Sequence, residues 1–314
     1  MKNLIQFAQH QKLLRNLKND FWARAYAQYS LWPNQVHVEP KTGFLRLEGS
    51  DLQLDQTQSA FLPALQYAQS LVKHGGLFKR STDGEITFEI DELFFLIQIP
   101  QDLDILYEVF SCGCYRLKLP PSQEKCVLWD IGMNVGIASL YFARQKAIEA
   151  VIGYEPFNLT FRQAERQFAF NPSFCSKITA VNRGIGAKNE VLSVAYDLQN
   201  RGSLSVFDLP EGQQGALREK VEIDDAALVL QGIIERYPGR HIIVKMDCEG
   251  GEHRILPALS QAKLLPSIKA LILEWHGPDS QRLEQLLTEN GFSFFSISVL
   301  ANTQGYIYAL HQKI

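Results

Sequence analysis

One short stretch of the sequence has the residue types of a turn that contacts a charged small molecule. In WDIGMNVG, a run of apolar residues ends at Asp130, and Gly132, Asn134 and Gly136 follow at alternate positions. Glycine lets the backbone come close to a ligand and adopt positive φ angles, and a segment of helical pattern begins directly after the turn. The pattern predicts a buried strand that ends at Asp130 and a turn that binds a ligand.

A second acidic residue ends the next apolar stretch. Glu155 follows AVIGY and precedes another segment of helical pattern. In a parallel sheet this position lies beside the first turn, and a carboxylate there can accept hydrogen bonds from both hydroxyls of a ribose. The turn and Glu155 together predict a ligand that contains a nucleoside.

The composition of the turn also distinguishes between nucleoside ligands. A dinucleotide-binding turn has the pattern G-x-G-x-x-G, but this chain has G-x-N-x-G, and Ile137 occupies the place of the third glycine. The carboxylate of Asp130 would also repel a pyrophosphate. S-adenosylmethionine has an ammonium and a sulfonium but no phosphate, so Asp130 would contact the ammonium directly or through water. We expect this cofactor to be held by Asp130, Gly132, Asn134, Gly136, Glu155 and, from a later stretch, Asp247.

Charged residues also gather where two later apolar stretches end. They are Lys245, Asp247, Glu249 and Glu252 in VKMDCEGGEHRIL, and Glu274 and His276 in LEWH. Acids near a helix N-terminus are favourable because of the backbone dipole, but this does not explain Asp247, which ends an apolar strand. Because parallel strands end at the same edge of a sheet, we expect Asp247, Glu274 and His276 to converge beside the cofactor's methyl group as catalytic residues. Lys245 is expected to pair with a nearby acid.

The periodicity of the chain predicts the sheet that these strand ends require. From about residue 124, apolar runs alternate with helical patterns, which indicates a Rossmann-like α/β fold with a doubly wound sheet. The runs lie at 125–130, 150–155, 177–186, 241–250, 268–276, 292–298 and 305–312. No helix separates the last two, so we expect a seven-stranded, mostly parallel sheet with an antiparallel hairpin at one edge. Asp224 and Asp225 are expected to cap a helix.

The N-terminal part carries no chemical motif. Residues 1–30 have a helical pattern, and EITFEI followed by LFFLIQI predicts a β-hairpin. We therefore divide the chain into an N-terminal α+β extension of unknown role (1–85), a segment leading into the core (86–123) and the cofactor-binding domain (124–314).

Bulk properties exclude several classes of protein. The 314 residues carry a formal net charge of −3, so the chain lacks the basic surface that nucleic-acid partners require. It has no apolar run long enough for a membrane-spanning helix, and its N-terminus lacks the apolar core of a signal peptide, so we expect a cytoplasmic protein. The five cysteines have no zinc-ribbon spacing and are expected to be free thiols.

The motifs, in their order, resemble the FkbM-type family of S-adenosylmethionine-dependent methyltransferases. They are DIGMNVG, YEPFN, VEIDD, VKMDCEGGEHRIL and LILEWH, and the most specific is the K-x-D-x-E-G-x-E signature that begins at Lys245. The resemblance covers about residues 105–300 and implies a class I methyltransferase fold. It also implies O-methylation of a hydroxyl on a sugar, glycan or secondary metabolite, and it makes DILYEVFSCGCYRL a cover over the cofactor.

Two routes for removing the proton of the acceptor hydroxyl are open. His276 could act as a general base, or Asp247 and Glu274 could hold a divalent cation such as Mg²⁺ that lowers the pKa of the hydroxyl. We favour the first, because a third oxygen ligand is not evident. The rival functions are an NAD-dependent oxidoreductase, disfavoured by Asp130 and the missing third glycine, and a non-catalytic binding module with a methyltransferase fold.

Overall fold

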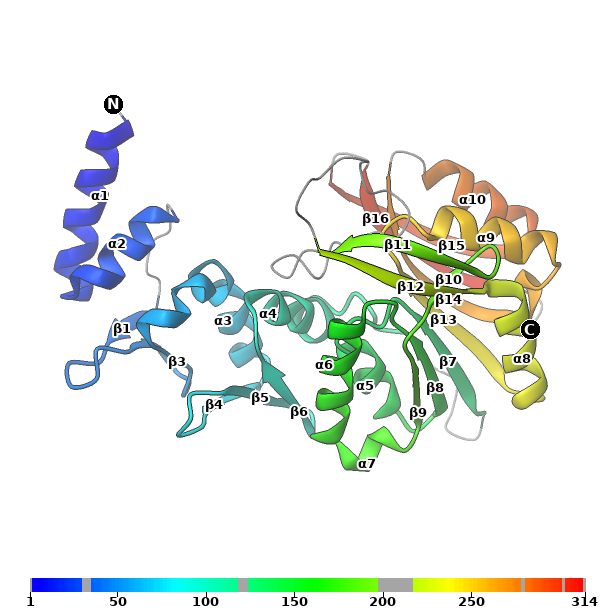
Figure 1. The fold of residues 1–314 in the computed structure, drawn as a ribbon, viewed down its shortest axis with the longest axis horizontal. Helices are drawn as coiled ribbons and strands as arrows, with labels where there is room; N and C mark the ends of the chain where they lie inside the picture. The colour runs from blue at the N-terminus through cyan, green and yellow to red at the C-terminus, as the bar shows by residue number, and fades with distance from the viewer. Residues whose placement is uncertain are drawn as a thin grey trace. The chain divides into compact units, whose positions relative to one another are not determined.

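The chain forms two compact units, residues 1–116 and 117–314, and each is described by itself. The computed structural model describes residues 2–29, 35–117, 124–196, 217–277, 280–300 and 303–312 (Figure 1). The predicted hairpin lies in the first unit, because its first strand pairs with a strand formed by residues before position 85. The boundary between the units is therefore on the C-terminal side of the hairpin.

The first unit combines two helices, two small antiparallel sheets and further helical segments. Its elements are α1 (Lys2–Leu17), α2 (Asp20–Gln28), β1 (Val36–Val38), β2 (Leu45–Leu47), β3 (Gln53–Leu54), η1 (Gln56–Ala64), α3 (Leu65–Lys73), β4 (Leu77–Arg80), β5 (Ile86–Ile90), β6 (Leu93–Ile97), α4 (Pro100–Leu106) and the π-helical η2 (Tyr107–Cys112). The strand order is β1-β2-β3 in one sheet and β4-β5-β6 in the other.

The predicted helix over residues 1–30 is two helices. The chain breaks at Lys18, which has a φ of 51°, and the side chain of Asn19 then accepts a hydrogen bond from the backbone N–H of Trp22 at 3.2 Å. This contact is an N-cap, which satisfies a backbone donor that the first turn of a helix leaves free. The predicted hairpin is confirmed as β5 and β6, and the alternating side chains of ITFEI give β5 its buried face.

The second unit is built on a seven-stranded sheet in the order β15-β16-β14-β13-β7-β8-β9. Its strands are β7 (Cys126–Ile131), β8 (Ile148–Tyr154), β9 (Ile178–Val181), β13 (His241–Asp247), β14 (Ile268–His276), β15 (Phe292–Leu300) and β16 (Gln304–His311). The strands from β9 to β14 along this order are parallel, β16 is antiparallel to β14, and β15 is antiparallel to β16. The predicted fold, with its antiparallel edge, is confirmed.

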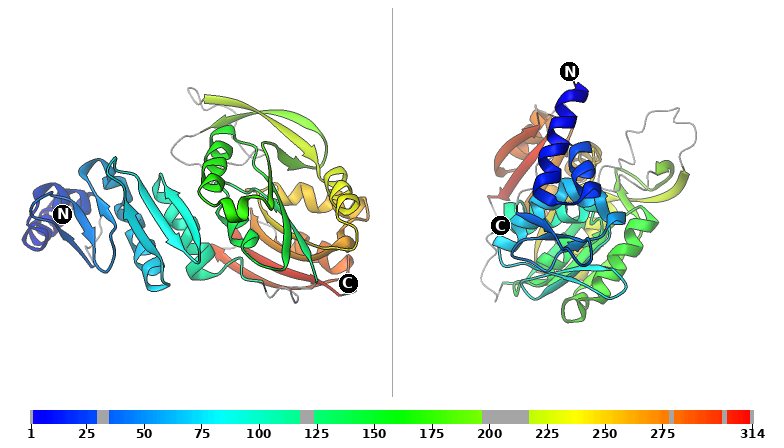
Figure 2. Two further views of the ribbon diagram at one scale, coloured as in Figure 1. Left: turned by 90° about the horizontal axis from the view of Figure 1, so that it is seen from below. Right: turned by 90° about the vertical axis from the view of Figure 1, so that its left-hand side faces the viewer.

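Helices cover this sheet on both faces (Figures 1 and 2). They are α5 (Ile137–Ala143), α6 (Asn158–Ala169), α7 (Pro172–Cys175), α8 (Ala226–Arg236), α9 (Glu252–Gln261), η4 (Leu265–Ser267) and α10 (Ser280–Glu289). The main core lies between the sheet and α8, α9 and α10, and includes Trp129, Val244, Leu256 and Leu283. Because successive side chains of a strand point to opposite faces, the charged residues at positions 130, 245 and 247 point away from this core.

A three-stranded sheet that the sequence did not reveal accompanies the large one. It has the order β10-β12-β11, with β10 (Gly184–Gly186), β11 (Glu190–Tyr196) and β12 (Leu217–Asp225). The stretch 177–186, predicted as one strand, is therefore divided between β9 and β10. Asp225 caps α8 as predicted, because its carboxylate accepts the N–H groups of Ala227 and Leu228. Residues 197–216, between β11 and β12, lie outside the described residues.

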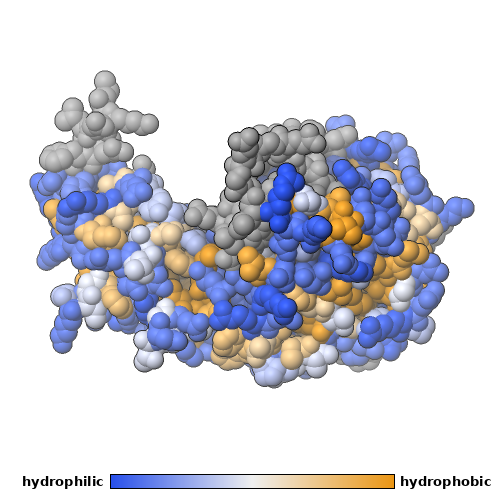
Figure 3. All heavy atoms as spheres, viewed as in Figure 1, coloured by the Kyte–Doolittle hydropathy of each residue, from blue (hydrophilic) through white to orange (hydrophobic). Residues whose placement is uncertain are grey.

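Figure 3 shows hydrophilic residues over much of one face, with separate apolar patches between them. Within the described ranges, no helix is both long and apolar enough to span a membrane.

The turn after β7 depends on a glycine that packs against the neighbouring strand. Gly132 has a φ of +75°, and a Cβ atom built on it would lie 1.8 Å from the backbone oxygen of Asp247. Positive φ is unfavourable for residues with a side chain, and here the obstacle is backbone rather than a movable side chain. Only glycine at this position allows the turn and the end of β13 to touch.

Substituting Gly132 by alanine should therefore destabilise the protein more than its φ angle alone explains. We expect Gly132→Ala to lower the free energy of unfolding by about 2–5 kcal/mol, the sum of backbone strain and a steric clash. The matched control is Gly239→Ala, which has a similar φ of +73° but open space around its Cβ, and it should cost about 1 kcal/mol. Urea unfolding measures both, and equal losses would contradict the close approach.

Candidate active site

The register of the large sheet brings the predicted site residues to one edge. In the register of the strands, Lys245 of β13 lies opposite Asp130 of β7, and Asp247 lies opposite Glu274 of β14. All four lie at or near the carboxyl ends of parallel strands, where α/β sheets bind their ligands. His276, the last residue of β14, lies at the same edge.

A buried ammonium neutralises the acid that precedes the turn. The side chain of Lys245 is 3% exposed and that of Asp130 is fully buried, and Lys245 Nζ lies 3.3 Å from Asp130 Oδ1. Lys245 also donates a hydrogen bond to the backbone oxygen of Gly132 at 2.6 Å, and Ser139 Oγ of α5 donates to Asp130 Oδ2 at 2.6 Å. Burial opposes the charged form of Lys245, but the carboxylates of Asp130 and Asp247 outweigh it and raise the pKa of Lys245.

This arrangement gives Asp130 a defined structural contact. The sequence predicted a contact with the cofactor's ammonium, whereas the carboxylate here faces Lys245 and Ser139. Lys245 pairs with a nearby acid, as predicted, and its second acid is Asp247, with Nζ 3.7 Å from Oδ2. The ammonium therefore links the acids at the ends of β7 and β13 and supports the backbone of the turn between them.

Glu155 lies just after β8 and binds the glycine-rich turn. Its side chain accepts the backbone N–H of Asn134 at 3.1 Å on one oxygen and that of Phe157 at 3.0 Å on the other. Asn134 itself has a φ of 51°, which lies in the left-handed region. Burial raises the pKa of Glu155 to about 7, although the two N–H groups oppose the rise. Each oxygen retains acceptor capacity beyond its one N–H contact.

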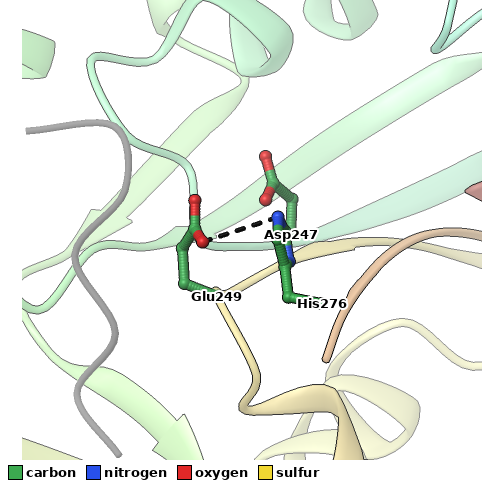
Figure 4. A group of neighbouring side chains, drawn as sticks. All are labelled: Asp247, Glu249 and His276. Atoms are coloured by element: carbon green, nitrogen blue, oxygen red, sulfur yellow. Dashed lines mark ion pairs between the residues drawn. The ribbon is translucent and has the colours of Figure 1, made fainter. Parts of the chain in front are cut away.

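The imidazole of His276 is surrounded by carboxylates. Its Nε2 lies 3.5 Å from Glu249 Oε2 and 3.8 Å from Glu274 Oε1, and its Nδ1 lies 3.8 Å from Glu252 Oε1. Figure 4 shows Asp247, Glu249 and His276 gathered around one point, with the imidazole and the Glu249 carboxylate facing each other. The His276 side chain is 17% exposed, which leaves it open to a small ligand.

Glu252 holds this group together, a function that the sequence analysis did not predict. It is fully buried, and its two oxygens accept the backbone N–H groups of His276 at 2.5 Å and Gly250 at 3.0 Å. It thereby joins the end of β14 to the start of α9. Burial raises its pKa, and the N–H of His276 opposes the rise. Glu252 is the last acid of the K-x-D-x-E-G-x-E signature, and its place in that motif was the signal that could have pointed to this role.

The charged residues around the turn suit a cofactor that carries positive charge and no phosphate. Asp130, Glu155 and Asp247 border the turn, and only one cation, Lys245, lies among them in the described part of the chain. Phosphate sites use the opposite balance of charge. Glu155 has free acceptor capacity for hydroxyls, and the side chain of Asp247 is 27% exposed at the edge of the sheet. S-adenosylmethionine fits these residues.

A metal ion would meet a different ligand set from the one that the sequence suggested. The ligand atoms of Asp247, Glu249 and His276 all lie within 4.8 Å of one another. Glu274, the expected partner of Asp247 in a metal site, is 4% exposed, and its Oε1 accepts a hydrogen bond from Gln304 Nε2 at 2.6 Å.

Removing the Lys245 ammonium should destabilise the protein strongly. Lys245→Met leaves the buried Asp130 carboxylate without its cation, and breaking one partner of a buried ion pair costs about 3–5 kcal/mol. The double variant Lys245→Met/Asp130→Asn removes both charges and should recover part of this loss. Chemical denaturation of wild type, Lys245→Met, Asp130→Asn and the double variant measures the coupling. If the double variant loses the sum of the two single losses, the ion pair does not couple the strands.

Comparison with known proteins identifies the family. The Methyltransferase FkbM domain matches residues 130–294, which is more than half of the chain. Methyltransferase sdnD of Sordaria araneosa is 24% identical over 230 residues, covering 65% of this chain and 87% of that protein. Methyltransferase 1 of Beauveria bassiana is 22% identical over 201 residues, covering 59% and 79%.

Solved structures of methyltransferases also align with the chain. The methyltransferase FkbM of Methylobacillus flagellatus aligns with a TM-score of 0.40 and 14% identity, over 80% of this chain and 60% of that one. The human methyltransferase 10 domain containing protein aligns with a TM-score of 0.40 and 12% identity, over 83% of this chain and 100% of that one. The family match favours the predicted methyltransferase over an oxidoreductase. The chain belongs to the FkbM family of S-adenosylmethionine-dependent methyltransferases.

Proposed function

We propose that this methyltransferase acts on a hydroxyl of a small molecule or glycan, and that His276 accepts the hydroxyl proton. The observation that supports this most directly is the imidazole of His276, partly exposed at the ligand edge of the sheet and flanked by Glu249 and Glu274. A hydroxyl must lose its proton when it is methylated, and an imidazole is the side chain best suited to take it near neutral pH.

The cofactor is proposed to lie over the glycine-rich turn. S-adenosylmethionine supplies an activated methyl group and its own leaving group. Glu155 accepts the ribose hydroxyls with the acceptor capacity that the N–H groups of Asn134 and Phe157 leave free. Gly132, Asn134 and Gly136 bring the backbone close to the methionyl part, and Asp247 faces the same space. Asp130 acts through Lys245, which it holds against the turn.

Three carboxylates surround the ring that is proposed to accept the proton. Oxygens of Glu249, Glu252 and Glu274 lie within 3.8 Å of the ring nitrogens of His276. Glu252 fixes the backbone of His276 through a hydrogen bond, so the ring is held where the acceptor hydroxyl must come. Glu274 is held in turn by Gln304. His276, Asp247 and Glu274 remain the proposed catalytic group.

A cation at the same place is the competing arrangement for removing the proton. Mg²⁺ prefers near-octahedral oxygen ligands and retains several waters. The cluster of Asp247, Glu249 and His276 offers an imidazole among its three ligands. An imidazole ligand suits Mg²⁺ less well than a carboxylate does. We therefore assign the imidazole of His276 to proton transfer.

The class of acceptor rests on the family. Hydroxyls of sugars and of secondary metabolites are what the resemblance implies, and the proton acceptor proposed here is consistent with a hydroxyl. The two curated relatives are named only as methyltransferases. A panel of glycans and polyketides, with release of S-adenosylhomocysteine as the readout, is the screen for the acceptor.

Loss of the imidazole should lower turnover without weakening cofactor binding. We expect His276→Ala to reduce kcat by about 10²–10⁴-fold, the usual contribution of a general base. The control is His241→Ala. His241 is the first residue of β13, at the end of the sheet away from the site, and its ring faces Glu124. The kcat of this variant should stay unchanged. Turnover is measured with the acceptor found in the screen, and cofactor affinity by calorimetry.

Chelation separates the two routes in the same assay. With His276 as the base, exhaustive dialysis against a chelator leaves the wild-type rate unchanged, and added Mg²⁺ does not raise it. A near-normal rate in His276→Ala, or a wild-type rate that depends on added Mg²⁺, would contradict the proposed role of His276.

A further inference from the structure

We propose that Asp247, Glu249 and His276 bind a divalent transition-metal ion, of which Zn²⁺ is the best match, and that the bound ion inhibits the enzyme. The ligand atoms of the three residues all lie within 4.8 Å of one another, and Figure 4 shows the side chains gathered around one point. In the described part of the chain, no other three His, Cys, Asp or Glu side chains form such a group. The inhibition rests on the function proposed above for His276, whereas the binding site does not.

The imidazole and the Glu249 carboxylate have the spacing of two ligands of one ion. His276 Nε2 lies 3.5 Å from Glu249 Oε2, which is longer than the roughly 3 Å of a usual N–H···O hydrogen bond. Two ligand atoms that each lie roughly 2.1 Å from a tetrahedral Zn²⁺ are about 3.4 Å apart. An ion therefore fits between these side chains with little movement. Asp247, whose ligand atom lies within 4.8 Å of the other two, needs a displacement of roughly 1 Å to join them.

The chemical types of the ligands select a transition metal. An imidazole nitrogen suits Zn²⁺, Cu²⁺ and Ni²⁺, whereas Mg²⁺ and Ca²⁺ are bound by oxygen. The two carboxylates balance the charge of the ion. Three protein ligands leave a fourth tetrahedral position for water, as in zinc sites that are open to a ligand. The imidazole that disfavours Mg²⁺ at this place therefore favours Zn²⁺.

A buried acid behind the imidazole orients it for this contact. His276 Nδ1 is buried without a hydrogen-bond partner and lies 3.8 Å from Oε1 of the fully buried Glu252. In zinc sites an outer carboxylate beside one ring nitrogen directs the other nitrogen to the metal. The side chains of Asp247, Glu249 and His276 are 27%, 23% and 17% exposed, so an ion can reach them from solvent. Nε2 is thus the ring nitrogen that is available to an ion.

An ion bound here removes the proposed proton acceptor. Coordination uses the lone pair of His276 Nε2, and the same lone pair is needed to accept the proton of the acceptor hydroxyl. The ion therefore competes with the reaction, which is the opposite of what a catalytic cation does. A chelator that removes the ion should restore the rate.

Calorimetric titration of Zn²⁺ into chelator-treated protein tests the site. Wild type should bind one ion per chain. His276→Ala and Glu249→Gln each remove a ligand atom and should weaken binding at least about tenfold, the smallest usual effect of losing even an outer-shell partner. No binding by wild type, or equal affinity in wild type and the two variants, would overturn the site. Either variant decides the question if the other fails to fold.

Two controls exclude other places for the ion. His241→Ala is matched to His276→Ala, because His241 Nε2 faces a single carboxylate, that of Glu124, at 3.3 Å. Cys112→Ser/Cys114→Ser removes two thiols, of which Cys112 is exposed and Cys114 partly so. Both proteins should bind Zn²⁺ as wild type does. Loss of binding in either control, with binding retained in Glu249→Gln, would also overturn the site.

Turnover with and without Zn²⁺ tests the inhibition. The two rates are compared within each protein, so a lower basal rate in a variant does not affect the result. Saturating Zn²⁺ should lower wild-type turnover by about 10²–10⁴-fold, as loss of a general base does, and Glu249→Gln should lose far less at the same concentration. A bound ion that leaves wild-type turnover unchanged would overturn the inhibition. Failure of the function proposed for His276 appears separately, as a near-normal rate of metal-free His276→Ala.

Discussion

The ammonium of Lys245 is the contact on which the candidate site depends. Asp130 is the second-last residue of β7, Asp247 is the last residue of β13, and Glu155 follows β8. These carboxylates would repel one another without a cation. Lys245 is buried between Asp130 and Asp247 and donates to the backbone of Gly132. A buried charge is tolerated only when it is paired and hydrogen-bonded. The same side chain therefore balances the charge of the edge and holds the turn against β13.

The geometry of the turn follows from this contact. Lys245 can reach the carbonyl of residue 132 because glycine there allows the turn to touch the end of β13. The turn then presents the N–H of Asn134 to Glu155, so the acid after β8 is oriented by the backbone that leaves β7. On the other side of the site, Glu252 accepts the backbone N–H of His276 and so fixes the backbone that carries the imidazole. Hydrogen bonds to backbone N–H groups thus position Glu155 and His276.

The sequence predicted the large sheet well because its signals are local. Apolar runs alternating with helical patterns gave the strand count and the antiparallel edge, and the ends of the runs gave the residues at the ligand edge. The small sheet of β10, β11 and β12 was missed, although β11 and β12 bury one side against a core of Phe157, Val194, Val221 and Ile223. Residues 197–216 separate these two strands along the chain, so no short turn marks them as a hairpin.

Sequence patterns could not predict the long-range contacts of the site. Pattern placed Asp130 at a strand end but did not give its partners, Lys245 and Ser139, because these come from other elements. Glu252 looked like an acid at a helix N-terminus, and only the fold brings it to the backbone of His276. The break in the first helix was also missed, because the cap at Asn19 interrupts a continuous helical pattern.

Titration of S-adenosylhomocysteine into wild-type protein and Glu155→Gln, at pH values below, at and above 7, tests the cofactor site most directly. The pKa of Glu155 is raised to about 7, so wild-type affinity should increase as the pH rises through this value and the carboxylate ionises to accept the ribose hydroxyls. Glu155→Gln should bind weakly and with no such pH dependence. Glu149→Gln, whose partner is Arg240, should match wild type. Equal affinity of Glu155→Gln and wild type at every pH would contradict the proposed contact between the Glu155 carboxylate and the ribose hydroxyls.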